Sequence, residues 1–314
     1  MHSKRSDWAV GFTCAALGAI LFSGKAIVVK LSYRYSVDPV VVIALRMGMA
    51  LPFFILAELW SRRQQSRVVL TRNERWRIVL LGFTGYYLSS LLDFYGLQYI
   101  TAALERLILY LSPTFVVLIT AVLLRRPIGK RVLLALALSY CGVLVAFAHD
   151  VRVGRDGLFI GSAFVMASAL TYAAYVVMSG ELVKRVGALR LTTQASIVAC
   201  LCCLLHFALT RDVHVLAGLQ PQVWQLGLLN AVAFTVLPVF AMMLGISRLG
   251  APRAAMIGMI GPVSTIFMAA VVLDEPITPW QLAGMALVMW GVWMTKPPRV
   301  AVPAVAAPVE PGTV

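Results

Sequence analysis

The chain has 314 residues, of which 61% are hydrophobic and only 13% are charged, and its mean hydropathy is +0.87. Soluble domains carry about 45–50% apolar and about 25% charged residues, so this composition cannot cover a water-soluble globule. The net charge is +14, but the basic residues lie between long apolar runs rather than on one face. The composition therefore argues against a soluble enzyme or a nucleic-acid reader, and indicates a protein of the lipid bilayer.

Apolar runs of about 17–25 residues predict membrane-spanning helices. Ten such runs follow one another along the chain: 9–30, 38–58, 77–98, 102–124, 131–148, 157–178, 192–210, 223–247, 251–273 and 279–295. The predicted fold is therefore all-α, a polytopic membrane bundle of ten spans. Residues 297–314, rich in Pro, Ala and Val, are predicted to form a disordered cytoplasmic tail.

The distribution of basic residues predicts the orientation of the spans. With the N-terminus inside, nineteen Lys and Arg residues fall on the cytoplasmic side and five on the outer side. Because cytoplasmic loops are enriched in Lys and Arg, we expect both termini in the cytoplasm. In a bacterium the protein would lie in the cytoplasmic (inner) membrane, where its positive charge anchors it to anionic lipid.

The chain contains an internal repeat. A shift of 149 residues aligns 96–142 with 245–291 without a gap, and thirteen of the 47 positions are identical. Each copy holds five spans, and an odd number of spans inserts the second copy upside-down. We therefore expect a first five-helix repeat over residues 1–148 and an inverted second repeat over residues 149–296.

The ends of the fourth and ninth spans carry opposite charges. Arg125 and Arg126 follow the fourth span, whereas Asp274 and Glu275 follow the ninth. If the two copies of the repeat insert in opposite orientations, the positive-inside rule requires basic residues at the cytoplasmic end of one copy and not at the equivalent, outer end of the other. Inverted repeats are typical of secondary transporters, whose central site opens alternately to either face.

With these features the chain resembles the drug/metabolite transporter superfamily, specifically its ten-span proteins with two EamA-type domains. The resemblance covers about residues 8–296 and rests on the five-plus-five repeat, the stretch LSPTFVVLITAVL followed by RRPI, and its copy IGPVSTIFMAAVVLDEPI. It implies a helical bundle that moves small organic metabolites. Family members usually carry a Glu after both spans; here Glu275 matches, but Arg126 stands at the first position.

Prolines near the middle of spans four and nine are expected to bend both helices. Pro113 and Pro262 each leave the carbonyl four residues earlier, that of Leu109 or Gly258, without its helical donor. Free carbonyls at membrane depth are tolerated only against protein or a wet cavity, so we expect a substrate path beside both prolines. Four polar residues are also assigned to this path: Tyr86, Tyr110, Tyr172 and Asn230. Helix–helix packing is the alternative role for each.

Five ionisable residues lie inside the spans, all in the outer half of the first repeat: Lys25, Arg46, Asp93, Glu105 and Arg106. A charge at the bilayer centre costs about 2.5–3.5 kcal/mol or more, so most should face the bundle interior. One interpretation is an outer gate formed by Asp93, Glu105, Arg106 and Glu275. The other is a substrate path that includes Lys25, Arg46 and Asp93, in which Lys25 or Arg46 meets a carboxylate of the substrate. Snorkelling to the surface is the alternative; depth in the membrane favours it most for Arg106, less for Glu105 and least for Arg46.

These features predict a secondary transporter, an exporter, of a small amphiphilic metabolite such as an amino acid or organic anion. It would work by alternating access around a site between the two repeats. No catalytic residue, metal or cofactor is expected, because the Cys and His residues are scattered. A non-transporting membrane scaffold and an intramembrane enzyme are the alternatives. Spans five and ten are almost free of polar residues, so we expect them to face lipid or a second copy in a homodimer.

Overall fold

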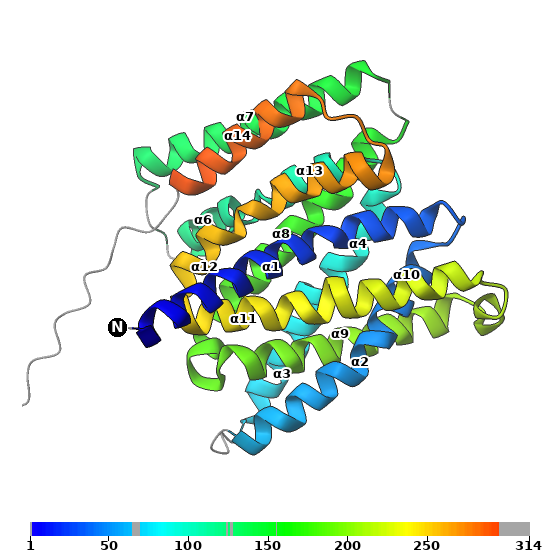
Figure 1. Ribbon diagram of the computed structural model, residues 1–314, viewed down its shortest axis with the longest axis vertical. Coiled ribbons are helices and arrows are strands. Elements are labelled where there is room, and N and C mark those ends of the chain that lie inside the picture. The colour runs from blue at the N-terminus through cyan, green and yellow to red at the C-terminus, as the bar shows by residue number, and fades with distance from the viewer. Residues whose placement is uncertain (1, 65–69, 124, 126–127, 155, 295–314) are drawn as a thin grey trace, which may run out of the picture.

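The computed structural model describes residues 2–64, 70–123, 125, 128–154 and 156–294, and every element in these ranges is helical (Figure 1). Nine of the described helical segments are long and apolar enough to cross a membrane. The protein is an integral membrane protein. The tenth expected span is described as the 16-residue helix α14 (Pro279–Met294). The expected tail, 297–314, lies outside the described residues.

The helices follow the predicted runs closely. The first half of the chain forms α1 (His2–Tyr33), α2 (Pro39–Gln64), α3 (Arg72–Leu81), η1 (Gly82–Leu88), α4 (Ser89–Leu97), α5 (Ala102–Leu109), α6 (Ser112–Leu123) and α7 (Lys130–Arg152). The second half forms α8 (Leu158–Val186), α9 (Ala188–Thr210), η2 (Val213–Leu216), α10 (Pro221–Ala231), η3 (Val232–Val236), α11 (Leu237–Leu249), α12 (Ala251–Gly258), α13 (Ile260–Leu273) and α14. Helix α8 runs past the predicted end at 178, because its stop signal is Gly187, with a φ of 86°.

Both halves interrupt their helices at equivalent places. Segments η1 and η3 are π-helical insertions, and residues 82–88 fall on 231–237 after the shift of 149 residues. By the same shift, the short helix α5 falls on the short helix α12. π-helical segments are rare and occur frequently at functional sites. The two halves therefore share local backbone distortions as well as sequence.

The bends expected in spans four and nine are present as breaks close before each proline. Helix α5 gives way to α6 just ahead of Pro113, and α12 gives way to α13 just ahead of Pro262. Pro262 is buried, whereas Pro113 is exposed. A proline removes one helical hydrogen bond and clashes with the preceding turn, which accounts for the position of each break.

The two carbonyls next to these breaks are satisfied by hydroxyl groups. The Ser112 hydroxyl donates a hydrogen bond to the backbone oxygen of Leu109 at 2.6 Å, across the break between α5 and α6. Tyr110 donates its hydroxyl to the Gly258 oxygen at 2.9 Å, from the first half of the chain to the second. Both carbonyls therefore face protein, one of the two environments that the bilayer interior allows.

The main helix contacts join the two halves of the chain. Helix α1 packs along α11, α2 along α9, α4 along α8, and α7 along α14. Figure 1 shows α1 beside α11 near the middle, and α7 and α14 lying together at one end of the bundle. Each half therefore completes its packing against the other half.

Helices α7 and α14 pack backbone against backbone through glycine. A Cβ atom on Gly142 would lie 2.4 Å from the carbonyl oxygen of Gly284, and a Cβ on Gly284 would lie equally close to the oxygen of Gly142. Small residues allow such close approach between helices in lipid. Leu144 and Trp290 on other faces of the pair are exposed. The expected contact with lipid or a second copy stays a prediction, and it concerns these outer faces.

Gly142→Ala is expected to lower the free energy of unfolding by about 1–3 kcal/mol, because the added methyl group forces the two backbones apart. Gly180→Ala, in helix α8, is the matched control, since a Cβ there meets open space. Gly180→Ala should leave the free energy of unfolding unchanged or raise it slightly, because alanine has a higher helix propensity than glycine. Thermal unfolding of both purified variants in detergent compares them. Equal melting temperatures would contradict the close contact.

Candidate functional site

The five ionisable residues of the spans gather in one buried group, here called the charged cluster: Lys25, Arg46, Asp93, Glu105 and Arg106. Their exposed fractions are between 0% for Glu105 and 5% for Lys25 and Arg46. They come from helices α1, α2, α4 and α5. The charges therefore face the bundle interior, as expected for most of them, and the alternative of snorkelling to the surface is wrong for Arg106 and Glu105.

Lys25 and Asp93 form a buried ion pair between α1 and α4. The ammonium nitrogen of Lys25 lies 2.6 Å from Oδ2 of Asp93. The Phe94 ring lies near both cations, 5.9 Å from Lys25 Nζ and 5.3 Å from the Arg46 guanidinium carbon. These contacts offset part of the cost of removing the charges from water. The Lys25 charge is thus already neutralised by the protein.

Arg46 keeps part of its hydrogen-bonding capacity unused. Its Nε donates to Oγ1 of Thr235 at 2.8 Å, and the Thr235 hydroxyl donates to the backbone oxygen of Asn230 at 2.8 Å. Thr235 belongs to the π-helical segment η3. Arg46 Nη1 and both amide atoms of the Asn230 side chain are buried without a hydrogen-bond partner in the described part of the chain. Such groups are costly, so they are candidates for ligand contacts.

Arg106 turns inward because it has acceptors on two other helices. Its Nε donates to Oγ1 of Thr265 in α13 at 3.0 Å, and its Nη2 lies 3.4 Å from the carbonyl oxygens of Phe22 and Ser23 in α1. Its neighbour Glu105 has its Oε2 3.8 Å from Arg106 Nε. Hydroxyls of the second half, from Thr235 and Thr265, thus complete a cluster whose charges come from the first half.

Glu275 holds the end of α13 to the start of α5. Its Oε1 lies 3.1 Å from Nζ of Lys30, and its Oε2 accepts a hydrogen bond from the Ala102 backbone at 3.1 Å. Lys30 also donates to the carbonyl oxygen of Ile100 at 2.7 Å. A carboxylate at a helix N-terminus is further stabilised by the helix dipole. We call Lys30, Ile100, Ala102 and Glu275 the outer latch.

The structure separates the residues that the sequence assigned to one gate. Glu275 pairs with Lys30, whereas Asp93, Glu105 and Arg106 belong to the charged cluster. Nothing in the sequence marks Lys30 as a partner of Glu275. Its position near the end of the first span gave it the properties of an ordinary interfacial lysine, and only the folded chain brings α13 beside it.

The three predicted tyrosines lie in two places. Tyr110 lies at the break between α5 and α6, as described above. Tyr86 and Tyr172 both pack against Tyr175, with ring centroids 5.2 Å and 5.7 Å apart. Tyr172 remains 40% exposed. The tyrosine group is thus distinct from the charged cluster.

Two aromatic rings that border the charged cluster, Phe22 and Phe94, were not predicted from the sequence. Phe22 lies 5.6 Å from Lys25 Nζ and 5.8 Å from the guanidinium carbon of Arg106, and Phe94 lies between Lys25 and Arg46. Phe22 precedes Lys25 by three residues, a spacing that places both on one helix face. That spacing is the only sequence signal for these contacts, and it is weak among so many aromatic residues.

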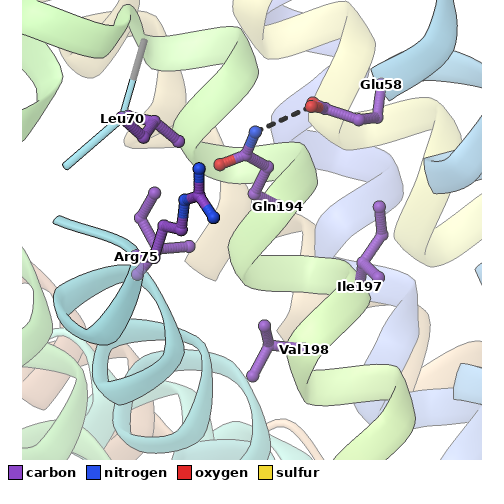
Figure 2. A pocket seen from close by; sticks show the side chains of 7 residues that line it. Glu58, Leu70, Arg75, Gln194, Ile197 and Val198 are labelled. Atoms are coloured by element: carbon purple, nitrogen blue, oxygen red, sulfur yellow. Dashed lines mark hydrogen bonds between the residues drawn. The ribbon is translucent and has the colours of Figure 1, made fainter. Parts of the chain in front are cut away.

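A separate cavity of about 230 Å³ lies between α2, α3 and α9 (Figure 2). Its lining residues are Glu58, Leu70, Arg75, Ile78, Gln194, Ile197 and Val198. Glu58 is buried, but it accepts hydrogen bonds from Thr193 at 2.9 Å and from Gln194 at 2.7 Å. None of the expected path residues lines this cavity, so it is not the predicted substrate path.

Comparisons with known proteins identify the family. The sequence profile described as "EamA-like transporter family" matches residues 9–148 and again residues 159–296. The chain belongs to the EamA-like transporter family. This EamA-like protein is 31% identical to the "Uncharacterized transporter YcbK" of Bacillus subtilis (strain 168), over 90% of its own length and 91% of that relative. The resemblance to the drug/metabolite transporter superfamily with two EamA domains is confirmed.

Two further likenesses agree with this assignment. The "Uncharacterized transporter YetK" of Bacillus subtilis (strain 168) is 27% identical, covering 72% of this chain and 69% of that one. A solved crystal structure shares the fold, with a TM-score of 0.60 at 16% identity, over 92% of this chain and 96% of the other. Both Bacillus subtilis relatives carry the name of transporters, and neither name gives a substrate.

In this EamA-like transporter, Glu275→Gln is expected to weaken the outer latch, because the amide loses the attraction to Lys30. In a cysteine-free background carrying Ala103→Cys, a buried position next to the latch, an impermeant maleimide should label the cysteine about fivefold faster. This corresponds to on the order of 1 kcal/mol for a partly exposed ion pair.

The control for this prediction is Asp38→Asn. Asp38 accepts a 2.7 Å hydrogen bond from Arg211, an ion pair that links the start of α2 to the end of α9 and raises the pKa of Arg211 above its ordinary value. Its loss should leave the labelling rate at position 103 unchanged. A rate that rises equally in both variants would indicate general loosening and would contradict a latch at Glu275.

Proposed function

We propose that this EamA-like protein is a secondary transporter that exports a small amphiphilic metabolite with an anionic group, such as an organic anion or an amino acid. The observation that supports this most directly is the pair of unsatisfied groups beside η3. Arg46 Nη1 and the Asn230 amide are buried and lack partners in the described structure. A carboxylate would accept hydrogen bonds from both. Lys25 is already paired with Asp93, so Arg46 is the cation proposed to meet the substrate.

The proposed mechanism is alternating access between two inverted five-helix halves, with ten spans in all. Support comes from the matching helix breaks, the matching π-helical segments and the reversed charges after spans four and nine. Because Arg46 belongs to the first half and Asn230 to the second, we propose a site between the halves. The path itself is proposed to run past Tyr86, Tyr110, Tyr172, Pro113 and Pro262.

The proposed direction follows from the outer latch. With both termini in the cytoplasm of an inner membrane, Lys30 and Glu275 lie at the outer ends of their spans. If the outer latch holds the bundle closed on the outer side, the substrate enters from the cytoplasmic side. This supports export as the direction of transport. The partners in this proposal are the substrate and the lipid bilayer, and a homodimer would use the outer faces of α7 and α14.

Purified protein in liposomes loaded with isotope-labelled amino acids and organic anions tests the proposal. A solute that raises the melting temperature of the protein should also exchange across the membrane, while its methyl ester should do neither. A scaffold would exchange no solute, and an enzyme would release a chemically altered product. Either outcome would contradict the proposed function.

A further inference from the structure

The cavity between α2, α3 and α9 contains a positive charge that the protein does not compensate. Gln194 donates to Oε1 of Glu58 at 2.7 Å, and Thr193 donates to Oε2 of Glu58 at 2.9 Å. Arg190 lies 3.9 Å from the same carboxylate and offsets its charge. Arg75, which also lines the cavity, has no hydrogen bond or ion pair within the described part of the chain. The cavity is therefore suited to an anion.

The remaining lining of the cavity is apolar. It consists of Leu70, Ile78 of α3, and Ile197 and Val198 of α9. Figure 2 shows Arg75 pointing toward Gln194, while Ile197 and Val198 follow farther along α9. The volume of about 230 Å³ is below the range of about 300–1,000 Å³ that is usual for pockets of small molecules. It fits an anionic group with a short stretch of apolar chain.

Helices α3 and α9 change from polar to apolar residues in the same direction along the cavity. On α3, Arg72, Arg75 and Ile78 are spaced three residues apart and share one face. On α9, Gln194 precedes Ile197 by three residues, and both line the cavity. A phospholipid has the same order of groups, with a charged headgroup followed by apolar chains.

The cavity lies at the level expected for lipid headgroups. Its charged residues are close to the ends of membrane-spanning segments, Glu58 near the end of Pro39–Ser61 and Arg75 near the start of Arg72–Leu97. Trp60 and Trp76 at the same ends are exposed, and tryptophan is enriched at the membrane–water interface. In the orientation expected from the basic residues, this level belongs to the cytoplasmic leaflet. Basic pockets between membrane helices on that side bind anionic headgroups.

We propose that this cavity is a specific binding site for an anionic phospholipid. The phosphate accepts hydrogen bonds from the Arg75 guanidinium, whose planar donors match phosphate oxygens, and an acyl chain begins against Ile78, Ile197 and Val198. Free phosphate would leave the apolar walls uncovered. Arg72 on the same face of α3 adds a second positive charge, which favours an anionic lipid over a zwitterionic one. The bound lipid bridges α3 and α9 and stabilises the folded protein.

Thermal unfolding of the delipidated protein in neutral detergent tests the choice of ligand. Added phosphatidylglycerol should raise the melting temperature in a saturable manner. Phosphatidylcholine with the same acyl chains, and inorganic phosphate at the same concentration, should raise it much less. An equal rise with phosphatidylcholine would overturn the preference for an anionic lipid. An equal rise with inorganic phosphate would assign the cavity to a free anion instead.

Two arginine variants of α3 test the position of the site. Arg75→Gln should weaken phosphatidylglycerol binding about tenfold in the same titration, because it removes charge-assisted hydrogen bonds. Arg77→Gln is the matched control, since Arg77 is also exposed but does not line the cavity. It should weaken binding about twofold or less. Equal losses in both variants would indicate general attraction to a basic surface and would overturn the site.

A photoreactive lipid locates the site in the unmodified protein, so that this test does not depend on the folding of a variant. Phosphatidylglycerol with a diazirine near the glycerol end of one acyl chain should label Ile78, Ile197 or Val198. Excess unlabelled phosphatidylglycerol should abolish this labelling, whereas labelling of the exposed Leu144 in α7 should persist. Mass spectrometry of the digested protein measures both. Labelling of the cavity residues that is absent, or that competitor does not reduce, overturns the proposal.

Discussion

Replacing Asp93 with asparagine is expected to destabilise the protein by about 3–5 kcal/mol, because Lys25 then keeps a buried charge without a counter-ion. The two side chains are only 6% and 2% exposed, so water cannot compensate. Lys25→Met should cost a similar amount, since it leaves the Asp93 carboxylate unpaired. Unfolding of the purified variants in detergent, monitored by tryptophan fluorescence, measures both effects.

The double variant with Lys25→Met and Asp93→Asn separates the ion pair from general packing damage. It removes both charges together, so it should recover part of the loss, with a coupling energy of about 0.5–3 kcal/mol. Lys30→Met, which breaks a more exposed pair, should cost about 1 kcal/mol or less. Strictly additive losses in the double variant would contradict a stabilising contact between Lys25 and Asp93.

Arg46→Gln is expected to weaken the binding of an anionic substrate by about 2–4 kcal/mol, roughly 30- to 1,000-fold. The reason is that Nη1 of Arg46 is buried and has no hydrogen-bond partner in the described part of the chain. The affinity of Arg46→Lys for the anionic substrate should lie between those of the wild type and Arg46→Gln, because lysine keeps the charge but not the planar fork of donors. Calorimetric titration with a carboxylate substrate and its methyl ester measures the effect.

The carboxylate–ester pair also provides the internal control for Arg46. Wild-type protein should prefer the acid, while Arg46→Gln should bind acid and ester with similar affinity. Arg34→Gln should keep the wild-type preference, because Arg34 is exposed and its guanidinium donates to the Leu273 carbonyl at 2.9 Å, away from Arg46 and its partner Thr235. An unchanged preference in Arg46→Gln would remove Arg46 from the substrate site.

The predictions that held were those set by properties of single segments. Apolar run length fixes where helices cross lipid, and the cost of a buried charge forces Lys25 and Asp93 toward the interior. The breaks near Pro113 and Pro262 follow equally from the missing backbone donor. These quantities can be read from a few neighbouring residues, without knowledge of the rest of the fold.

The predictions that failed or were incomplete depended on which segments meet. Arg106 lies near the start of its span, so depth alone favoured snorkelling, but Thr265 and the α1 carbonyls provide acceptors inside the bundle. The Tyr110 hydroxyl reaches the Gly258 oxygen across the two halves. The π-helical segment η3, which carries Thr235, contains neither Gly nor Pro and gave no sequence signal.

The glycine contact between α7 and α14 has a mechanical consequence. Helices α7 and α14 are the last helices of the two halves, and their backbones approach closely at Gly142 and Gly284. They lie at one end of the bundle, while α2 and α3 lie at the other (Figure 1). If one half rotates against the other while this contact is kept, the contact acts as the pivot. The largest displacement then occurs at the end of the bundle formed by α2 and α3.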